Sequence, residues 1–529
     1  MLKLRTLQSS APAMAIASAP MASAPAQMDP EPEPRQEKED VPASAIVSSR
    51  HGMSRLQASL IIMVLTGISS LNTLGSGVLT ISLPAIARDI GLDEALLLWP
   101  PSVYALAAGC TLLIFGAVSD VVGPRPVWLT GAAMYGAFTL GVGLCRTASQ
   151  LIAFRTVLGL AIAMCLPAAV SLTTQSFLPG RWRNMAFAFQ GMGQPLGYSL
   201  GLILGGVFTD TIGWRWAYYI SLIINTLLVI CAVFVLPGRQ HDNKNVLARL
   251  RHDTDWVGAL TLSSSLGILS YVLASISKDY QQVKLAYNIV LLVLGILLLP
   301  AFVLWVGYRE RNNLPALVPN SLWKNAVFST TCITVFVTWA VFNAFQYFGA
   351  LYFERVVHTT ALEASIRFLP MVFVGAGTNI VTGFLVDKVE VGLMVSITAA
   401  INVVPPLLMA LSTPSRGYWR GDFFAMLLSP LHPDVLFTVS NLIIAKAYPG
   451  KSQSLAGAVF NAVSQIGNSV GLAVTAAIAS SLAQRKDNSE EGLLDGYHAA
   501  FWTMFAAMAI VVPITYFGLR RGGKVGATD

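Results

Sequence analysis

Charged residues are scarce in this sequence, and their scarcity excludes an ordinary soluble domain. Asp, Glu, Lys and Arg together make up 12% of the 529 residues, about half of the share in a typical soluble protein. Hydrophobic residues make up 54%, and the mean hydropathy is +0.63. The chain is therefore predicted to lie in a lipid bilayer. Its formal charge of +7 is then explained by basic residues that orient membrane helices, and no nucleic-acid partner is expected.

Metal-ligating and nucleotide-binding patterns are also missing. The sequence has six His and five Cys, and none of them has a spacing typical of a metal site. The Gly-Lys-Ser segment at 450–452 resembles the end of a phosphate-binding loop. However, Ala445 occupies the position of the first glycine of such a loop, and no strand precedes it. We therefore expect no metal, no cofactor and no enzymatic activity.

The sequence has instead a series of long apolar stretches. Each is about twenty residues long, the length that an α-helix needs to cross a bilayer. We identify fourteen, centred in residues 58–82, 97–117, 127–145, 150–173, 186–208, 215–236, 256–277, 286–307, 327–352, 368–386, 392–411, 423–445, 455–482 and 498–519. If the amino terminus is cytosolic, the tail and the even-numbered loops carry about twice as many Lys and Arg as the odd-numbered loops. This bias predicts a multi-pass protein with both termini in the cytosol. We expect it in the plasma membrane, with the vacuolar membrane as the alternative.

The first 55 residues have a different composition. They are rich in Ala, Pro, Ser and charged residues, which cannot bury enough apolar surface to fold. This composition predicts a disordered cytosolic tail. A cleaved signal peptide is the alternative, because Lys3 and Arg5 precede small residues. Residues 8–25, however, lack the Leu- or Val-rich run that such a peptide needs.

Two patterns occur twice, about half of the chain apart. Gly116-Ala-Val-Ser-Asp120 returns as Gly383-Phe-Leu-Val-Asp387, and the Phe-Gln-Gly-Ser-Gly pattern of 189–201 returns in 460–471. Such an internal repeat predicts a duplicated helical bundle. The predicted organisation is a tail (1–55), an amino-terminal six-helix lobe (56–237), a cytosolic loop with two inserted helices (238–310), a carboxy-terminal six-helix lobe (311–520) and a short tail (521–529).

These patterns resemble the motifs of the major facilitator superfamily. Residues 116–125, Gly-Ala-Val-Ser-Asp-Val-Val-Gly-Pro-Arg, resemble its loop between helices two and three, and Arg155-x-x-x-Gly159 resembles its helix-four motif. The glycines of 201–206 resemble the antiporter motif of its drug-exporting branch. Gly-Trp-Arg-Trp at 213–216 is similar to the fourteen-spanner drug:proton antiporters, and 97–104 looks like their fungal members. The resemblance covers about residues 56–520.

The resemblance implies an all-α integral membrane protein with the major facilitator fold. Two six-helix lobes and two inserted linker helices, fourteen transmembrane helices in all, would work by alternating access around a midplane cavity. We also assign the repeated loop motif to the cytosolic gate, because carboxylates at helix ends can cap a neighbouring helix or pair with a basic residue, in a contact that breaks as the lobes move. The gating residues so implied are Gly116, Asp120, Gly123, Arg125, Gly383, Asp387 and Lys388.

The first span departs from the family pattern. In the fourteen-spanner exporters that this chain resembles, an acidic residue occupies the position of Gly75. The uncharged Asn72 lies one turn earlier. In the fifth span Leu202 replaces the proline of the antiporter motif, and Pro195 is the nearest break. A first-span proton carrier is therefore missing, and the coupling group is expected elsewhere.

Ionisable residues inside the predicted spans are the candidates for proton coupling, because the bilayer makes them costly. They are Arg155 in the fourth span and His432 and Asp434 in the twelfth. Two prolines, Pro430 and Pro433, predict that the helix of the twelfth span starts at Asp434 and that its outer half is irregular. We predict Asp434 as the proton carrier, assisted by His432 or Arg155. The simpler alternatives are that Asp434 caps a helix and that Arg155 binds a backbone carbonyl.

Uncharged polar side chains of the lobe-facing spans are the candidates for substrate contacts. They are Asn72, Gln190, Gln194, Asn343, Gln346, Tyr347, Asn461 and Gln465. Amide and aromatic groups without charge suit lipophilic ligands, although each can also hold helices together. The predicted function is export of small lipophilic compounds, such as drugs or secondary metabolites, by proton antiport. We expect a monomer whose partners are its substrate, protons and lipid; the alternatives are another solute such as an iron chelate or amino acid, a uniporter, or a non-transporting membrane receptor.

Overall fold

The computed structural model describes residues 54–92, 99–178, 180–238, 246–252, 254–278, 284–447, 453–486, 489–520 and 523. Within these ranges all regular structure is helical, and no strand occurs in them. The all-α fold class is thus confirmed for this part of the chain. The predictions for the tails, 1–55 and 521–529, lie outside the described residues except at 54, 55 and 523.

The described residues of the first half form six long helices: α2 (Arg55–Ile90), α3 (Trp99–Val122), α4 (Pro124–Leu144), α5 (Ala148–Ser176), α6 (Arg181–Asp210) and α7 (Arg215–Val235). Local sequence explains where they begin and end. The Ser54 side chain starts α2 by accepting a hydrogen bond from the Gln57 amide at 3.1 Å, and Thr147 starts α5 in the same way. Gly91 ends α2 in the left-handed conformation, at φ +66°, which glycine adopts without steric cost.

The second half follows a short helix, α8 (Val246–His252), and the inserted pair α9 (Trp256–Lys278) and α10 (Ala286–Arg311). A 3₁₀ turn, η3 (Asn320–Lys324), leads into this half. Its helices are α11 (Ala326–Leu351) with a π-helical turn η4 (Tyr352–Val356), α12 (Ala361–Arg367), α13 (Leu369–Leu385), α14 (Val391–Ile401), α15 (Val404–Ala410), α16 (Asp422–Leu428), α17 (Leu431–Ala447), α18 (Gln453–Arg485) and α19 (Glu490–Gly518). Two short 3₁₀ turns, η5 (Pro414–Arg416) and η6 (Tyr418–Arg420), lie between α15 and α16.

Each of the fourteen predicted spans coincides with a helix or with a pair of consecutive helices. Among the described residues, twelve helical segments are long and apolar enough to cross a membrane; α12–α13, α14–α15 and α16–α17 each count as one segment. In α9 the shorter apolar stretch Trp256–Val272 is present, and α6 is 30 residues long but less apolar. The count of fourteen crossings therefore remains a prediction for α6 and α9.

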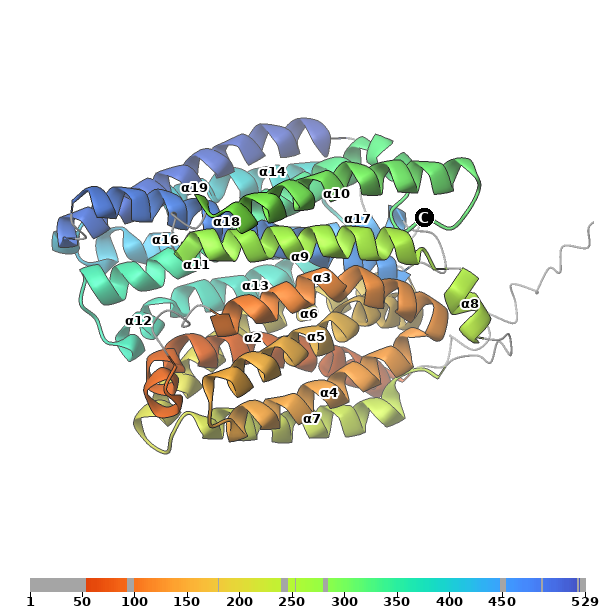
Figure 1. Cartoon of the computed structure of the whole chain (residues 1–529), viewed down its shortest axis with the longest axis horizontal. Coiled ribbons are helices and arrows are strands. Elements are labelled where there is room, and N and C mark those ends of the chain that lie inside the picture. Colours follow the sequence, from red (N-terminus) through yellow and green to blue (C-terminus); the bar gives the residue numbers. More distant parts are fainter. Residues whose placement is uncertain are drawn as a thin grey trace, which may run out of the picture. The chain divides into compact units, whose positions relative to one another are not determined.

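Equivalent helices of the two halves make the same contact. In Figure 1 the helices of the first half, red to yellow, form one group and those of the second half, cyan to blue, form another; α6 packs along α2, and α18 packs along α11. A Cβ atom on Gly201 of α6 would lie 2.2 Å from the carbonyl oxygen of Leu74, and a Cβ on Gly471 of α18 would lie 2.2 Å from that of Ala340. Only glycine allows such close backbone approach. The repeated sequence pattern thus corresponds to a repeated helix contact.

The inserted helices lie against the seam between the two halves. Helix α9 contacts α3 of the first half and α18 of the second, and α10 packs on α9. One buried apolar cluster continues from Leu113 in α3 through Leu266 in α9 and Phe302 in α10 to Leu455 in α18. The inserted pair is therefore attached to both halves at once.

The twelfth span differs from its prediction. Its outer half is helical, as α16, and α17 begins at Leu431, so the expected irregular segment is limited to residues 429–430. The Asp434 amide already donates a hydrogen bond to the Pro430 carbonyl at 3.0 Å. The expectation that the helix starts at Asp434 is wrong because Pro433 lies in the first turn of α17, where no amide hydrogen is needed.

Exposed loop positions allow a test of the predicted orientation. Asn312, after α10, and Ser415, after α15, are both exposed and fall on opposite sides in the predicted topology. In intact cells an impermeant maleimide is expected to label Ser415→Cys and to label Asn312→Cys only after permeabilisation. Cys145 is buried in the structure, so this native cysteine contributes little background. Equal labelling of both variants in intact cells would contradict the topology.

Candidate functional site

The predicted cytosolic ends of the two halves, called here the inner ends, are joined at Asp120. This residue lies in the last turn of α3, and its carboxylate accepts hydrogen bonds from the Ser454 and Leu455 amides of α18, at 2.9 and 3.0 Å. The hydroxyls of Ser119 and Ser454 lie 2.9 Å apart beside it. The first amides of a helix carry a partial positive charge, which a carboxylate stabilises. Asp120 thus caps a helix of the opposite half, although its gating role remains a prediction.

The turn after Asp120 depends on Gly123. Its φ of +110° lies in a region that other residues rarely adopt, and Pro124 then starts α4. The Arg125 guanidinium donates a hydrogen bond to the Val233 carbonyl in the last turn of α7. Arg125 is therefore bonded within the first half.

The glycines of the repeated loop motif lie at close contacts between helices of the two halves. A Cβ atom on Gly116 of α3 would lie 2.6 Å from the Ala458 Cβ of α18, and a Cβ on Gly383 of α13 would lie 2.8 Å from the Ala188 Cβ of α6. Both distances are shorter than side-chain carbons allow. The inner ends of the halves therefore touch on both sides of the seam, α3 against α18 and α13 against α6.

The repeat is less complete at its carboxylate. The Oδ1 atom of Asp387 is buried and has no hydrogen-bond partner, and Lys388 is exposed. The helix-capping contact that Asp120 makes with both carboxylate oxygens is thus not reproduced by Oδ1 of Asp387. The predicted gate is asymmetric in this structure.

A buried carboxylate lies farther from the inner end, where three helices of both halves meet. Asp434 of α17 is 7% exposed and shares a hydrogen bond with the Asn379 side chain of α13. It lies in the middle of the twelfth span, which runs from Asp422 at the start of α16 to Ala447 at the end of α17. Its Oδ2 atom has no partner. A Cβ on Gly375 of α13 would lie 2.6 Å from this oxygen and 3.6 Å from Pro195 of α6. Asp434 is therefore at the seam and is bonded to a neighbouring helix.

The two predicted assistants of Asp434 lie elsewhere. His432 is fully buried, and its Nδ1 is 3.1 Å from the Thr398 hydroxyl of α14, within the second half. Arg155 is 2% exposed in the first half; its Nε donates to the Pro100 carbonyl at 3.4 Å, and its guanidinium lies 4.6 Å from the Tyr104 ring centre. These contacts match the simpler interpretation of Arg155, and they give neither residue a contact with Asp434.

Hydroxyl and amide groups surround the position of the missing first-span acid. A Cβ on Gly75 would lie 3.2 Å from the Tyr135 hydroxyl, which donates a hydrogen bond to the Leu71 carbonyl at 3.0 Å. The Tyr104 hydroxyl donates to the Asn72 side chain. Tyr104, which also lies beside Arg155, thus links this arginine to the uncharged Asn72.

The predicted substrate contacts are divided among several environments. Hydrogen bonds within one half use Gln190, which donates to Thr173 at 2.8 Å, and Asn461, which donates to the Gly457 carbonyl at 2.8 Å. Gln465 accepts from Asn468 at 2.9 Å. Asn343 is exposed, and Gln194 and Tyr347 are half-buried. Gln346 lines a small cavity between the halves, and the substrate role of all eight residues stays a prediction.

Glu354 is a residue of the seam that the sequence did not reveal. It follows α11 in the π-helical turn η4 and lines the same small cavity as Gln346, opposite Thr80 of α2 and Tyr198 of α6. In the sequence it looks like an ordinary charged residue at the end of a span. The only signal was its carboxylate beside an apolar run.

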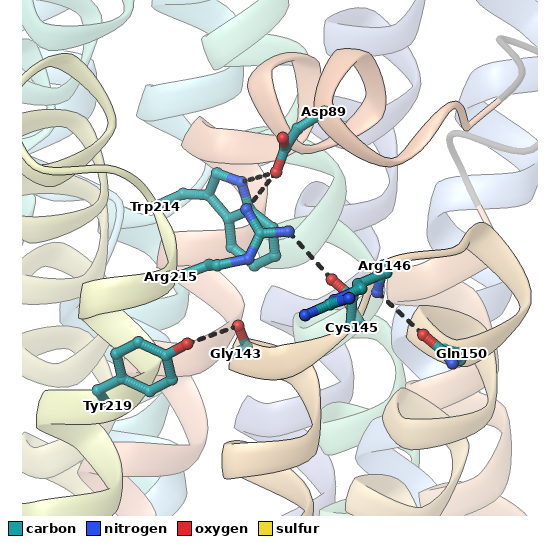
Figure 2. A network of polar contacts seen from close by, with 8 residues as sticks. All are labelled: Asp89, Gly143, Cys145, Arg146, Gln150, Trp214, Arg215 and Tyr219. Atoms are coloured by element: carbon teal, nitrogen blue, oxygen red, sulfur yellow. Dashed lines mark hydrogen bonds and ion pairs between the residues drawn. The ribbon is translucent and has the colours of Figure 1, made fainter.

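The Gly-Trp-Arg-Trp motif joins the outer ends of three helices of the first half. Figure 2 shows Arg215 and Trp214, at the start of α7, both bonded to the Asp89 carboxylate near the end of α2. Arg215 also donates to the Cys145 carbonyl after α4 at 3.0 Å, and Tyr219 donates to the Gly143 carbonyl at 3.0 Å. The motif therefore has a structural role in this chain.

Replacement of Arg215 by Lys is expected to lower the free energy of unfolding by about 1 kcal/mol, because Lys lacks the fork that reaches Asp89 and the Cys145 carbonyl together. Both side chains of the ion pair are about one-third or more exposed, at 33% and 43%, which keeps the effect small. Thermal unfolding of the purified protein measures it. Arg420→Lys, at another exposed loop position, is the control; equal midpoints for both variants would contradict this role.

Comparison with known proteins agrees with this architecture. The family model of the Major Facilitator Superfamily matches residues 65–431. MFS-type transporter 1 of Pyricularia oryzae is 59% identical over 91% of this chain and 86% of its own length, and efflux pump terJ of Aspergillus terreus is 23% identical over 84% of each. The human organic anion transporter MFSD10 (TETRAN) has a similar fold, with a TM-score of 0.61 at 14% identity over 87% of this chain and 99% of its own. The chain belongs to the Major Facilitator Superfamily and is a membrane transporter, not an enzyme.

Proposed function

We propose that this transporter exports small lipophilic compounds by proton antiport and that Asp434 carries the coupling proton. The observation that supports this role is a buried carboxylate at the seam of the two halves with one oxygen unpaired. Removal of a carboxylate from water is costly unless it is paired or protonated. A group that alternates between a paired and a protonated state can carry one proton in each transport cycle.

The surroundings of Asp434 support alternating exposure. Asp434 shares a hydrogen bond with Asn379 of its own half. Helix α6 of the first half lies close to Asn379, because a Cβ on Gly191 would lie 2.3 Å from Asn379 Oδ1. Because α6 belongs to the other half, movement of the halves changes what covers the carboxylate. The seam thus offers a proton carrier even though the first span has Gly75 in place of an acid.

A lipophilic substrate is supported by the composition of the lobe-facing helices and by the relatives. Aromatic side chains gather on α11 and its neighbours, where the rings of Trp339 and Phe460 are 5.5 Å apart and those of Phe437 and Phe460 are 5.3 Å apart. Apolar and aromatic walls suit small lipophilic ligands. Among the relatives, the efflux pump of Aspergillus terreus is named for export.

The function is tested with the full-length protein in energised vesicles and a panel of fluorescent lipophilic compounds. Saturable uptake that collapses when an uncoupler removes the proton gradient is the expected result. Saturable transport that is insensitive to the uncoupler would indicate a uniporter. Absence of transport for every compound would contradict export of lipophilic compounds and direct the search to another solute or to a receptor role.

A further inference from the structure

A π-helical turn sends two neighbouring charged side chains to different sides at the outer end of α11. The Val357 amide donates to the Tyr352 carbonyl at 3.0 Å, an i→i+5 bond in place of the usual i→i+4 bond. Such a turn adds one residue and rotates the next side chains by about a quarter of a turn around the helix axis. Arg355 shares a hydrogen bond with Tyr497 of α19, within its own half. Glu354 faces the cavity between the halves.

The cavity beside Glu354 has walls from both halves. Thr80 of α2 and Tyr198 of α6, whose side chains share a hydrogen bond, face Gln346 of α11 and Ser365 of α12 across it. Its volume of ≈ 20 Å³ exceeds the roughly 10–15 Å³ that a single water-sized group requires. Apolar residues, among them Leu202 and Phe368, form the rest of the wall. The cavity therefore has room for one water-sized polar group.

The charge of the site selects a cation. The neighbouring Arg355 acts on Glu354 through its charge but is bonded to Tyr497 and does not line the cavity. The other polar groups of the wall are hydroxyls and an amide. Carboxylate, hydroxyl and amide oxygens accept hydrogen bonds, and an ammonium group has only donors. The Tyr198 ring adds a surface that attracts cations. An anion would be repelled by Glu354.

We propose that this cavity is an outer subsite for the protonated amino group of an exported lipophilic amine, with Glu354 as the residue that recognises its charge. The inference rests on the proposed export of lipophilic compounds and names one substrate class within it. The amino group binds between the halves on the outer side of Gln346, and the attached apolar part lies toward the lobe-facing aromatic side chains. Separation of the halves would remove Thr80 and Tyr198 from Glu354 and release the amine.

A pair of probes that differ only in charge tests the subsite. Dansylcadaverine is a fluorescent lipophilic primary amine, and its N-acetylated derivative is neutral at the same position. The purified full-length protein is expected to bind the amine more tightly than the acetylated compound. Glu354→Gln should weaken binding of the amine about tenfold and change binding of the acetylated compound less than twofold. Glu490→Gln, at an exposed carboxylate, serves as the control and should change neither.

The outcomes separate this inference from the proposed function. Unchanged affinity for the amine in Glu354→Gln would overturn the subsite and leave export of lipophilic compounds intact. Equal loss of binding for both probes would show a structural role for Glu354 and overturn the inference as well. Loss of proton-driven accumulation of both probes with unchanged binding would make Glu354 a proton carrier instead. Failure of the wild-type protein to bind either probe or any compound of the panel would overturn the proposed function and the subsite together.

Discussion

Replacement of Asp434 by Asn is expected to abolish accumulation of substrate against its gradient while it leaves exchange of substrate across the membrane within about twofold of wild type. Asn has the shape of a protonated Asp and cannot release a proton. The variant should therefore resemble a carrier that is loaded permanently, so net proton-driven transport stops. Counterflow exchange needs no net proton movement and continues. Accumulation in energised vesicles and counterflow in de-energised vesicles measure the two activities.

A second buried carboxylate of the same span is the matched control for Asp434. Asp422, at the start of α16, is 5% exposed and accepts a hydrogen bond from the Ser412 hydroxyl at 2.5 Å, within its own half. Asp422→Asn keeps an acceptor for Ser412 and should keep proton-driven accumulation, with at most a lower thermal stability. Asp434→Asn with accumulation and pH dependence like wild type would place the coupling group elsewhere.

Asp120→Asn is expected to slow transport by about tenfold or more and to leave equilibrium binding of substrate nearly unchanged. Asn offers one acceptor oxygen and no charge to the two amides of α18 that Asp120 binds. The loss of a charge-assisted hydrogen bond is worth about 1.5–3 kcal/mol, and 1.4 kcal/mol changes an equilibrium tenfold. The state with closed inner ends should therefore be less populated. Transport rate, together with the accessibility of a cysteine placed at the inner end, measures this shift.

The repeated motif supplies the control for Asp120 in the same molecule. Asp387 occupies the equivalent position, but its buried Oδ1 has no partner in this structure, so Asp387→Asn should affect the closed inner end less. Asp120→Asn that loses substrate binding while it keeps normal opening and closing would refute the gating role. If both substitutions slow transport equally, the structural difference between Asp120 and Asp387 does not affect gating.

Long-range duplication was predictable from the sequence because it depends on composition and spacing. Apolar stretches of membrane-spanning length predicted where the helices lie. The repeated glycine patterns predicted a duplicated bundle, and Gly201 and Gly471 make equivalent contacts in its two halves. The helix-capping contact of Asp120 is one of the two contacts expected from the sequence, the other being pairing with a basic residue.

Directions of side chains were harder to predict, because they depend on local details of the helices. Two nearby prolines suggested a long irregular segment, but Pro433 fits the first turn of α17 and the break is confined to residues 429–430. Arg155 turned out to be held by a carbonyl and a tyrosine ring. Glu354 lines the cavity at the seam from a π turn, and hydrophobic periodicity does not predict where such a turn occurs.

The inserted pair has a consequence for how the protein meets the surrounding lipid. Because α9 contacts both α3 and α18, it separates the contact between these two helices from the surrounding hydrocarbon. A Cβ on Gly267 of α9 would lie 2.8 Å from the Cys110 sulfur of α3, so α9 packs tightly against the first half. We therefore expect α9 to restrict lateral entry of lipophilic molecules from the bilayer at the α3–α18 contact.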